Sequence, residues 1–280
     1  MSQQYSPSGF NVLPPVVKNL LIINGLFYLA TVSFETAFGI DLVNLMGLHY
    51  FQSDLFRPYQ FVSYMFLHGS ISHVVWNMFA LWMFGYLLEN VWGSKRFLTY
   101  YMATGIGAAI IQSFVMWYTF APVQVAVQEY QQNAGIQNFV AFINAYPPHS
   151  QQLFDDLKIF LTKWNVSPLS EESMMMSKDY ITQVWQDHIS TPTVGASGAV
   201  YGILLAFGMM FPNMLVYVYF LFPIKAKWIV IAYGALELYS GISNNPSDNV
   251  AHFAHLGGMI FGFFLIIYWK KKHPGFHGEL

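Results

Sequence analysis

Two polar residues that could act together in catalysis lie inside apolar stretches of this sequence. Ser197 opens one hydrophobic run, directly after Gly195 and Ala196, and His255 lies within another. Ionisable side chains at membrane depth are costly, and they usually face a cavity or a partner. An imidazole beside a serine hydroxyl can remove its proton and make it a nucleophile. We therefore expect Ser197 and His255 to meet, although Ser197 taken alone could be a small packing residue.

Glycines follow both residues at helical spacing. Gly198 and Gly202 follow the serine, and Gly258 and Gly262 follow the histidine. Small residues four positions apart allow two membrane helices to approach closely. We expect these two glycine faces to pack together and to bring the imidazole within reach of the hydroxyl.

Tyr201 lies one helical turn after Ser197, so its ring can pack on the imidazole of His255 and hold its orientation. No acid lies near His255 in the same apolar run. Three acids occur in the apolar stretches: Glu35, Glu89 and Glu237. Each lies near the end of its stretch or on a helix face whose direction the sequence does not fix. We therefore predict a two-residue dyad rather than a triad.

His73 and Asn77 are four residues apart, so they share one face of an expected helix. Both side chains can donate a hydrogen bond to an oxyanion, and the free backbone N–H groups beside Ser197 at a helix start can do the same. The alternative role for His73 and Asn77 is hydrogen bonding between helices.

Four histidines suggest a metal site: His68, His73, His252 and His255. The sequence has no HExxH motif and no zinc spacing that includes a carboxylate, so we expect neither a metal nor another cofactor. We expect His68 to order the preceding loop by hydrogen bonding and His252 to make a supporting polar contact.

The elements that position these residues are predicted to be membrane helices. Of 280 residues, 55% are hydrophobic and only 9% are charged, against about 25% in an ordinary soluble domain. There is no cysteine, which excludes disulfides and thiolate metal sites. Six apolar runs approach the ~20 residues that cross a bilayer: 17–38, 72–91, 97–120, 197–222, 226–243 and 251–269. We predict an all-α membrane protein with a bundle of six transmembrane helices.

The positive charges predict the orientation of this bundle. Eight of the twelve Lys and Arg residues fall on one side of the membrane in a six-helix count: Lys18, Lys95, Arg96, Lys225, Lys227, Lys270, Lys271 and Lys272. By the positive-inside rule this side is the cytoplasm. We expect cytoplasmic tails at 1–16 and 271–280, a membrane domain at 17–270, no signal peptide and a bacterial inner membrane location.

Three segments depart from a simple bundle. Residues 39–71 are too interrupted to span and too aromatic to lie free in water, so an interfacial or re-entrant segment is expected. Residues 121–190 are polar with helical apolar spacing, which predicts a helical subdomain inserted on the outer face. It is either a tolerated insertion or a guide for substrates. Pro212 is expected to end the fourth helix early, only ~22 Å after Ser197, so the serine would lie below the outer surface. Residues 214–222 are then expected to run along the inner boundary of the membrane.

Three motifs in this order resemble the rhomboid family of intramembrane serine proteases. GASGAVYG at 195–202, HVVWN at 73–77 and AHLGGMIFG at 254–262 are similar to the family patterns GxSGxxxG, HxxxN and AHxxGxxxG. The resemblance implies Ser197 as nucleophile, His255 as general base, and an oxyanion hole made by His73, Asn77 and the Ser197 backbone N–H. It also implies that the site is shaped by a group of small and aromatic residues: Gly195, Gly198, Tyr201 and Gly258.

The resemblance further implies that residues 39–71 support the bundle laterally and that residues 244–250 form a mobile cap over the site. The predicted function is a serine endopeptidase that cleaves transmembrane segments of other proteins. Its expected partners are these substrates and the lipid bilayer, with no nucleic acid and no metal. The alternatives are a non-catalytic rhomboid-like protein that binds membrane clients, and a transporter, which the lack of internal repeats disfavours.

Overall fold

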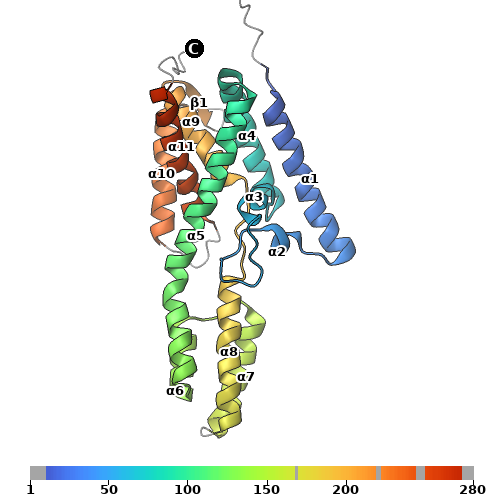
Figure 1. The fold of residues 1–280 in the computed structure, drawn as a ribbon, viewed down its shortest axis with the longest axis vertical. Helices are drawn as coiled ribbons and strands as arrows, with labels where there is room; N and C mark the ends of the chain where they lie inside the picture. The colour runs from blue at the N-terminus through green and yellow to red at the C-terminus, as the bar shows by residue number, and fades with distance from the viewer. Residues whose placement is uncertain (1–10, 168–169, 219–221, 244–249, 273–280) are drawn as a thin grey trace, which may run out of the picture. The chain divides into compact units, whose positions relative to one another are not determined.

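The computed structural model describes residues 11–167, 170–218, 222–243 and 250–272, which are mostly helical and include one β-hairpin (Figure 1). The chain divides into two compact units. The first unit contains residues 1–48, 58–112 and 193–280, and the second contains residues 49–57 and 113–192. The predicted site residues all belong to the first unit.

Four of the described helices are long and apolar enough to cross a membrane: α1 (Pro15–Phe38), α4 (Ile71–Trp92), α5 (Ser94–Gln132) and α11 (His252–Lys272). Two further helices, α9 (Ser197–Met210) and α10 (Ala226–Ser243), have 14 and 18 residues and are not among the four. The predicted count of six spans is therefore supported by length and composition for four helices only.

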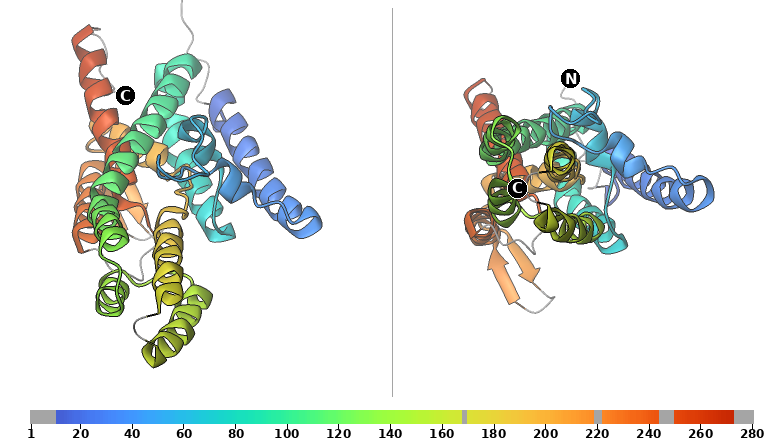
Figure 2. Two further views of the ribbon diagram at one scale, coloured as in Figure 1. Left: turned by 60° about the horizontal axis from the view of Figure 1, so that its bottom comes forward. Right: turned by 90° about the horizontal axis from the view of Figure 1, so that it is seen from below.

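The apolar run over 197–222 is not one helix, because α9 ends at Met210, and the early end expected at Pro212 is confirmed. Pro212 lacks the backbone N–H that a continuing helix needs. The chain then forms an antiparallel hairpin of β1 (Leu215–Val218) and β2 (Phe222–Lys225). The hairpin projects away from the helices of its unit (Figure 2).

The predicted end of the third run at residue 120 is wrong, because α5 continues through Pro122 to Gln132. A proline inside a helix removes one hydrogen bond and usually bends or ends it. Here the continuation buries Val123 and Tyr130 in the core of the second unit. This burial favours the helix beyond the proline.

The second unit contains three more helices: α6 (Ile136–Ala145), α7 (Gln151–Val166) and α8 (Glu171–Ile189). Ser150 and Ser170 cap α7 and α8 by accepting the N–H of the third helical residue. Their apolar faces enclose buried Phe139, Phe160 and Trp164. The helical character predicted for this segment is thus observed, whereas its place on the outer face stays a prediction.

The link between α1 and α4 contains three short helical segments: α2 (Leu42–Met46), α3 (Gln60–Ser63) and the 3₁₀ helix η1 (Tyr64–Phe66). The Tyr64 hydroxyl donates a buried hydrogen bond to the Gly105 carbonyl of α5 at 2.7 Å. A single carboxylate also joins two helices, because Glu89 of α4 accepts the backbone N–H groups of Val16 and Val17 at the start of α1. These contacts help to hold the first unit around α9 and α11.

Candidate active site

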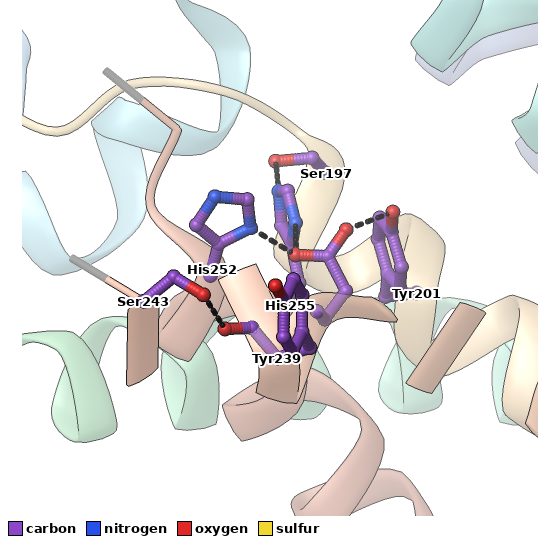
Figure 3. A network of polar contacts seen from close by, with 7 residues as sticks. Ser197, Tyr201, Tyr239, Ser243, His252 and His255 are labelled. Carbon is purple, nitrogen blue, oxygen red and sulfur yellow. Dashed lines mark hydrogen bonds and ion pairs between the residues drawn. The ribbon is translucent and has the colours of Figure 1, made fainter. Parts of the chain in front are cut away.

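The side chains of Ser197 and His255 meet between α9 and α11. The serine is the first residue of α9, and the histidine lies in the first turn of α11. His255 Nε2 lies 2.8 Å from Ser197 Oγ, which is hydrogen-bond distance (Figure 3). His255 is buried, with 7% of its surface exposed. The contact expected from the sequence is therefore present.

The ring of Tyr201 stacks on the imidazole of His255, with the centroids 4.2 Å apart and the planes 6° apart. The tyrosine hydroxyl donates a hydrogen bond to Glu237 Oε1. The stack fixes the plane of the imidazole from the α9 side, as the one-turn spacing predicted.

The predicted dyad has an acid beside it, because Glu237 of α10, whose facing the sequence left open, lies next to His255. Glu237 Oε2 is 2.9 Å from His255 Nδ1 and 2.6 Å from His252 Nδ1. The contact of Glu237 with His252 has hydrogen-bond geometry. His255 Nδ1 is close to the carboxylate but is not aligned with it as in a hydrogen bond. The serine, His255 and the acid thus form a connected row.

Sequence reasoning named Glu237 but did not place it at the site, because helical spacing relates residues of one helix only. Glu237 lies on α10, separated from His255 by the whole connection to α11. A usable signal was the spacing of His252 and His255 by three residues, which places two imidazoles on one face. An acid in the neighbouring apolar run is the natural partner for such a pair.

The turn before Ser197 needs a glycine at position 195. Gly195 has φ +130°, a conformation that other residues rarely adopt. Its N–H donates to the Tyr64 carbonyl at 2.9 Å. A Cβ on Gly195 would lie 2.9 Å from His73 Cε1 and Nε2 and 3.3 Å from Ser197 Oγ. The absence of a side chain therefore lets the His73 ring approach the serine hydroxyl.

The backbones of α9 and α11 touch where Gly198 faces Gly258. A Cβ on Gly258 would lie 1.8 Å from the Gly198 carbonyl oxygen. The other half of the predicted glycine contact is wrong, because Gly202 lies against Thr104 and Gly262 against the hydroxyl of Tyr100. Side chains of α5 therefore contact these two glycines, and the Tyr100 hydroxyl also donates to the Gly202 carbonyl at 2.9 Å.

The two predicted oxyanion donors lie on α4. Ser70 caps this helix by accepting the His73 N–H at 3.2 Å, which fixes His73 in the first turn. Asn77 follows one turn later and is buried, with 6% of its surface exposed. The structure brings the ring of His73 to the turn before Ser197, and it places Asn77 on the same face of α4.

His68 lies in the loop before α4 and is 1% exposed. The expected ordering hydrogen bond is not formed with good geometry, since neither ring nitrogen has an aligned partner in the described part of the chain. Its ring instead contacts that of His73 edge to face, with centroids 5.0 Å apart. Burial, and next the His73 imidazole, lower the pKa of His68 to about 4, while the nearby Phe66 backbone opposes the shift.

The predicted cap over the site, residues 244–250, lies outside the described residues except for Val250. The expected tails at 1–16 and 271–280 are likewise described only over residues 11–16 and 271–272.

Comparison with known families agrees with the motifs that meet at this site. A family model described as the rhomboid domain matches residues 55–122 and 173–272, which are more than half of the chain. The chain belongs to the rhomboid family. The matched segments include His73, Asn77, Ser197 and His255, and most of the predicted insertion, residues 123–172, lies between them. The resemblance inferred from the sequence is confirmed.

Three relatives carry rhomboid names. An uncharacterized mitochondrial rhomboid protein of Schizosaccharomyces pombe is 23% identical over 79% of this chain and 55% of its own length. The rhomboid protease GluP of Bacillus subtilis is 47% identical over 18% of this chain and 10% of its own. A chloroplastic rhomboid-like protein of Arabidopsis thaliana is 27% identical over 33% of this chain and 34% of its own. The chain therefore spans about half, or less, of the length of these relatives.

Family membership and the apolar helices identify the chain as an integral membrane protein. Two of the three relatives are named as organellar, so the comparisons do not support the expected bacterial inner membrane.

Proposed function

We propose that this rhomboid protein is a serine endopeptidase that cleaves transmembrane segments of other membrane proteins. The observation that carries the proposal is the 2.8 Å contact between Ser197 Oγ and His255 Nε2. A serine hydroxyl at this distance from an unprotonated ring nitrogen can lose its proton as it attacks a carbonyl carbon. The protease name of one relative, GluP, is consistent with this chemistry.

The reaction would begin when Ser197 Oγ attacks the scissile carbonyl and its proton passes to His255 Nε2. The carbonyl oxygen becomes an oxyanion, for which His73, Asn77 and the Ser197 backbone N–H are the proposed donors. As the tetrahedral intermediate collapses, His255 gives the proton to the leaving amine. Water then hydrolyses the acyl-enzyme, with His255 again as the base.

Glu237 would select the tautomer that this mechanism needs. A neutral imidazole carries one proton, and a carboxylate 2.9 Å from His255 Nδ1 favours that proton on Nδ1. The lone pair then remains on Nε2, opposite the serine. Tyr201 holds the ring plane by stacking, and it also contacts the second carboxylate oxygen. This arrangement supports a triad-like site in place of the predicted dyad.

The substrates would be transmembrane helices with small or helix-weakening residues near the cut. An intact helix keeps its carbonyl groups in internal hydrogen bonds, so it must unwind locally before a peptide bond can enter the site. The cytoplasmic position of both termini stays a prediction from the charge distribution.

A non-catalytic protein that binds membrane clients is the alternative. A binding protein has no use for a buried histidine aligned on a serine, whereas a protease requires both. This observation favours the protease.

Purified full-length protein in liposomes with a model transmembrane substrate tests the proposal. We expect cleavage by the wild type and its loss in Ser197→Ala and His255→Ala. Ser33→Ala and His149→Ala, which change exposed residues elsewhere, are the matched controls and should cleave normally. Equal cleavage by Ser197→Ala would contradict the assignment of the nucleophile. For Asn77→Ala we expect a graded loss of ~10²–10³ in turnover, and an unchanged rate would remove it from the oxyanion hole.

A further inference from the structure

Three metal-binding side chains converge behind the catalytic serine. Glu237 of α10 and the two histidines His252 and His255 of α11 each offer one ligand atom, and these atoms lie within 4.8 Å of one another. The carboxylate oxygen is 2.6 Å from His252 Nδ1 and 2.9 Å from His255 Nδ1. Two imidazoles and one carboxylate are a common ligand set for zinc, with water as the fourth ligand.

The burial of this group distinguishes it from an exposed acidic cluster. The side chains of Glu237, His252 and His255 are 10%, 13% and 9% exposed. His255 Nδ1 is buried and has no aligned hydrogen-bond partner, although it lies next to the carboxylate. An atom of this kind can give its lone pair to a metal without breaking a well-formed hydrogen bond.

We propose that Glu237, His252 and His255 bind one Zn²⁺ ion, and that the bound ion inhibits the enzyme. The inhibitory part rests on the proposed function, whereas the binding part does not. The motifs of the sequence predict no metal because they contain no carboxylate at zinc spacing, and the carboxylate comes from a different helix. The ion would be an inhibitor of this site and not a cofactor of the reaction.

Inhibition follows from the tautomers of His255. A neutral imidazole has one N–H, so a lone pair given to Zn²⁺ from Nδ1 leaves the proton on Nε2. Nε2 then cannot accept the proton of Ser197 Oγ. Without the ion, the proton sits on Nδ1 beside Glu237, and Nε2 is the base. The metal and the Nδ1 proton therefore compete for one atom, and the protein is active only in the metal-free form.

The site can take the ion with a small adjustment. Zinc lies about 2.0–2.2 Å from histidine nitrogen and carboxylate oxygen, so tetrahedral ligands are about 3.3 Å apart. The present separations of 2.6 and 2.9 Å need to widen by less than 1 Å. The third separation, between the two histidine ligand nitrogens, is at most 4.8 Å and would have to approach the same value.

Zinc binding is tested on the Ser197→Ala protein, so that the result does not depend on proteolysis. The full chain in detergent is dialysed against ZnCl₂, and bound zinc is measured by atomic absorption. We expect one ion per chain, and at least tenfold weaker binding in Glu237→Gln and in His252→Ala when each is combined with Ser197→Ala. His149→Ala removes an exposed histidine of the second unit and serves as the matched control with unchanged binding. Equal zinc retention by all these proteins would overturn the site.

The inhibitory role is tested with the wild type in liposomes. We expect Zn²⁺ to slow cleavage of the model substrate by at least tenfold, EDTA to restore it, and Mg²⁺ at the same concentration to have no effect. In His252→Ala, the ratio of the rates with and without zinc should return toward one. Zinc binding without slower cleavage would overturn the inhibitory role. If the intact chain cleaves nothing, the proposed function fails, while binding to Ser197→Ala still supports the site.

Discussion

The ring of Tyr201 lies nearly parallel to the imidazole of His255, with 4.2 Å between the centroids. Because the two residues come from α9 and α11, the stack joins the helix of the proposed nucleophile to the helix of the proposed base. The hydroxyl at the far end of the same ring reaches Glu237 on α10. One aromatic side chain therefore contacts two of the three groups on which the proposed chemistry depends.

Replacement of Tyr201 separates the stack from the hydroxyl contact. Tyr201→Phe keeps the ring and removes the contact with Glu237, whereas Tyr201→Leu removes both. Stacked ring pairs contribute about 0.5–1.5 kcal/mol, so we expect turnover to fall about tenfold in the Leu variant and about threefold or less in the Phe variant. The two losses of turnover are measured by cleavage of the model substrate, and thermal unfolding checks that both variants fold. Equal losses in the two variants would show that the ring itself does not matter.

The backbone contact between Gly198 and Gly258 predicts that a single methyl group is damaging. A Cβ on Gly258 would lie 1.8 Å from the Gly198 carbonyl oxygen, so Gly258→Ala must push α9 and α11 apart. We expect a clear fall in melting temperature and loss of cleavage. Gly25→Ala is the matched control, because a Cβ on Gly25 of α1 meets no atom within 4 Å. Since alanine favours helices more than glycine, Gly25→Ala should be neutral or slightly stabilising. Similar melting temperatures for the two variants would contradict the close packing.

The hydrogen bonds of Glu89, which lie away from the proposed site, are expected to stabilise the fold. Its carboxylate accepts the N–H groups of Val16 and Val17 at 2.9 and 2.8 Å and the hydroxyl of Ser94 at 2.6 Å. Hydrogen bonds to a charged group contribute about 1.5–3 kcal/mol each, so we expect Glu89→Ala to lower the free energy of unfolding by at least about 2 kcal/mol. The free energy of unfolding is measured by denaturant titration in detergent, followed by tryptophan fluorescence. The exposed acid of α1 gives the control, since Glu35→Ala should stay within about 0.5 kcal/mol.

Burial of His68 is expected to make the free energy of unfolding depend on pH. Its pKa of about 4 in the folded protein lies below the ordinary value of 6.5, because burial disfavours the charged ring. Between these values the unfolded chain binds more protons than the folded one, so stability falls as pH drops from 6.5 to 4 and is unaffected by this group above 6.5. At pH 5 the loss due to His68 is about 2 kcal/mol. His68→Phe should therefore lose less stability than the wild type between pH 8 and pH 5. Parallel unfolding curves for the two proteins would contradict the buried neutral state of this histidine.

The contact of Ser197 with His255 could be predicted from the sequence because it depends on local patterns. The glycines at 198 and 258 mark faces where helices approach closely, and Tyr201 is placed by the helical repeat. Glu237 could not be placed in the same way. Whether a residue of α10 faces α11 depends on how the two helices pack, and a single sequence carries little information about that packing.

The end of α9 before Pro212 was predicted, whereas the end of α5 was not, and the two prolines show why. Pro122 does not end α5, because the residues after it are buried in the second unit. Pro212 is followed by Asn213 and a run rich in β-branched and aromatic residues, which favours strands, and the chain forms a hairpin. The same residue type therefore has opposite outcomes, and tertiary burial decides between them.

The close approach of Gly198 to Gly258 has a mechanical consequence. Since main-chain atoms are in contact there, neither helix can slide or rotate against the other without a clash, so the two helices move as one rigid piece. A change in bilayer thickness that tilts one of them tilts the other by the same amount. We therefore expect lipid chain length to alter how substrates enter, while the spacing between hydroxyl and imidazole stays constant.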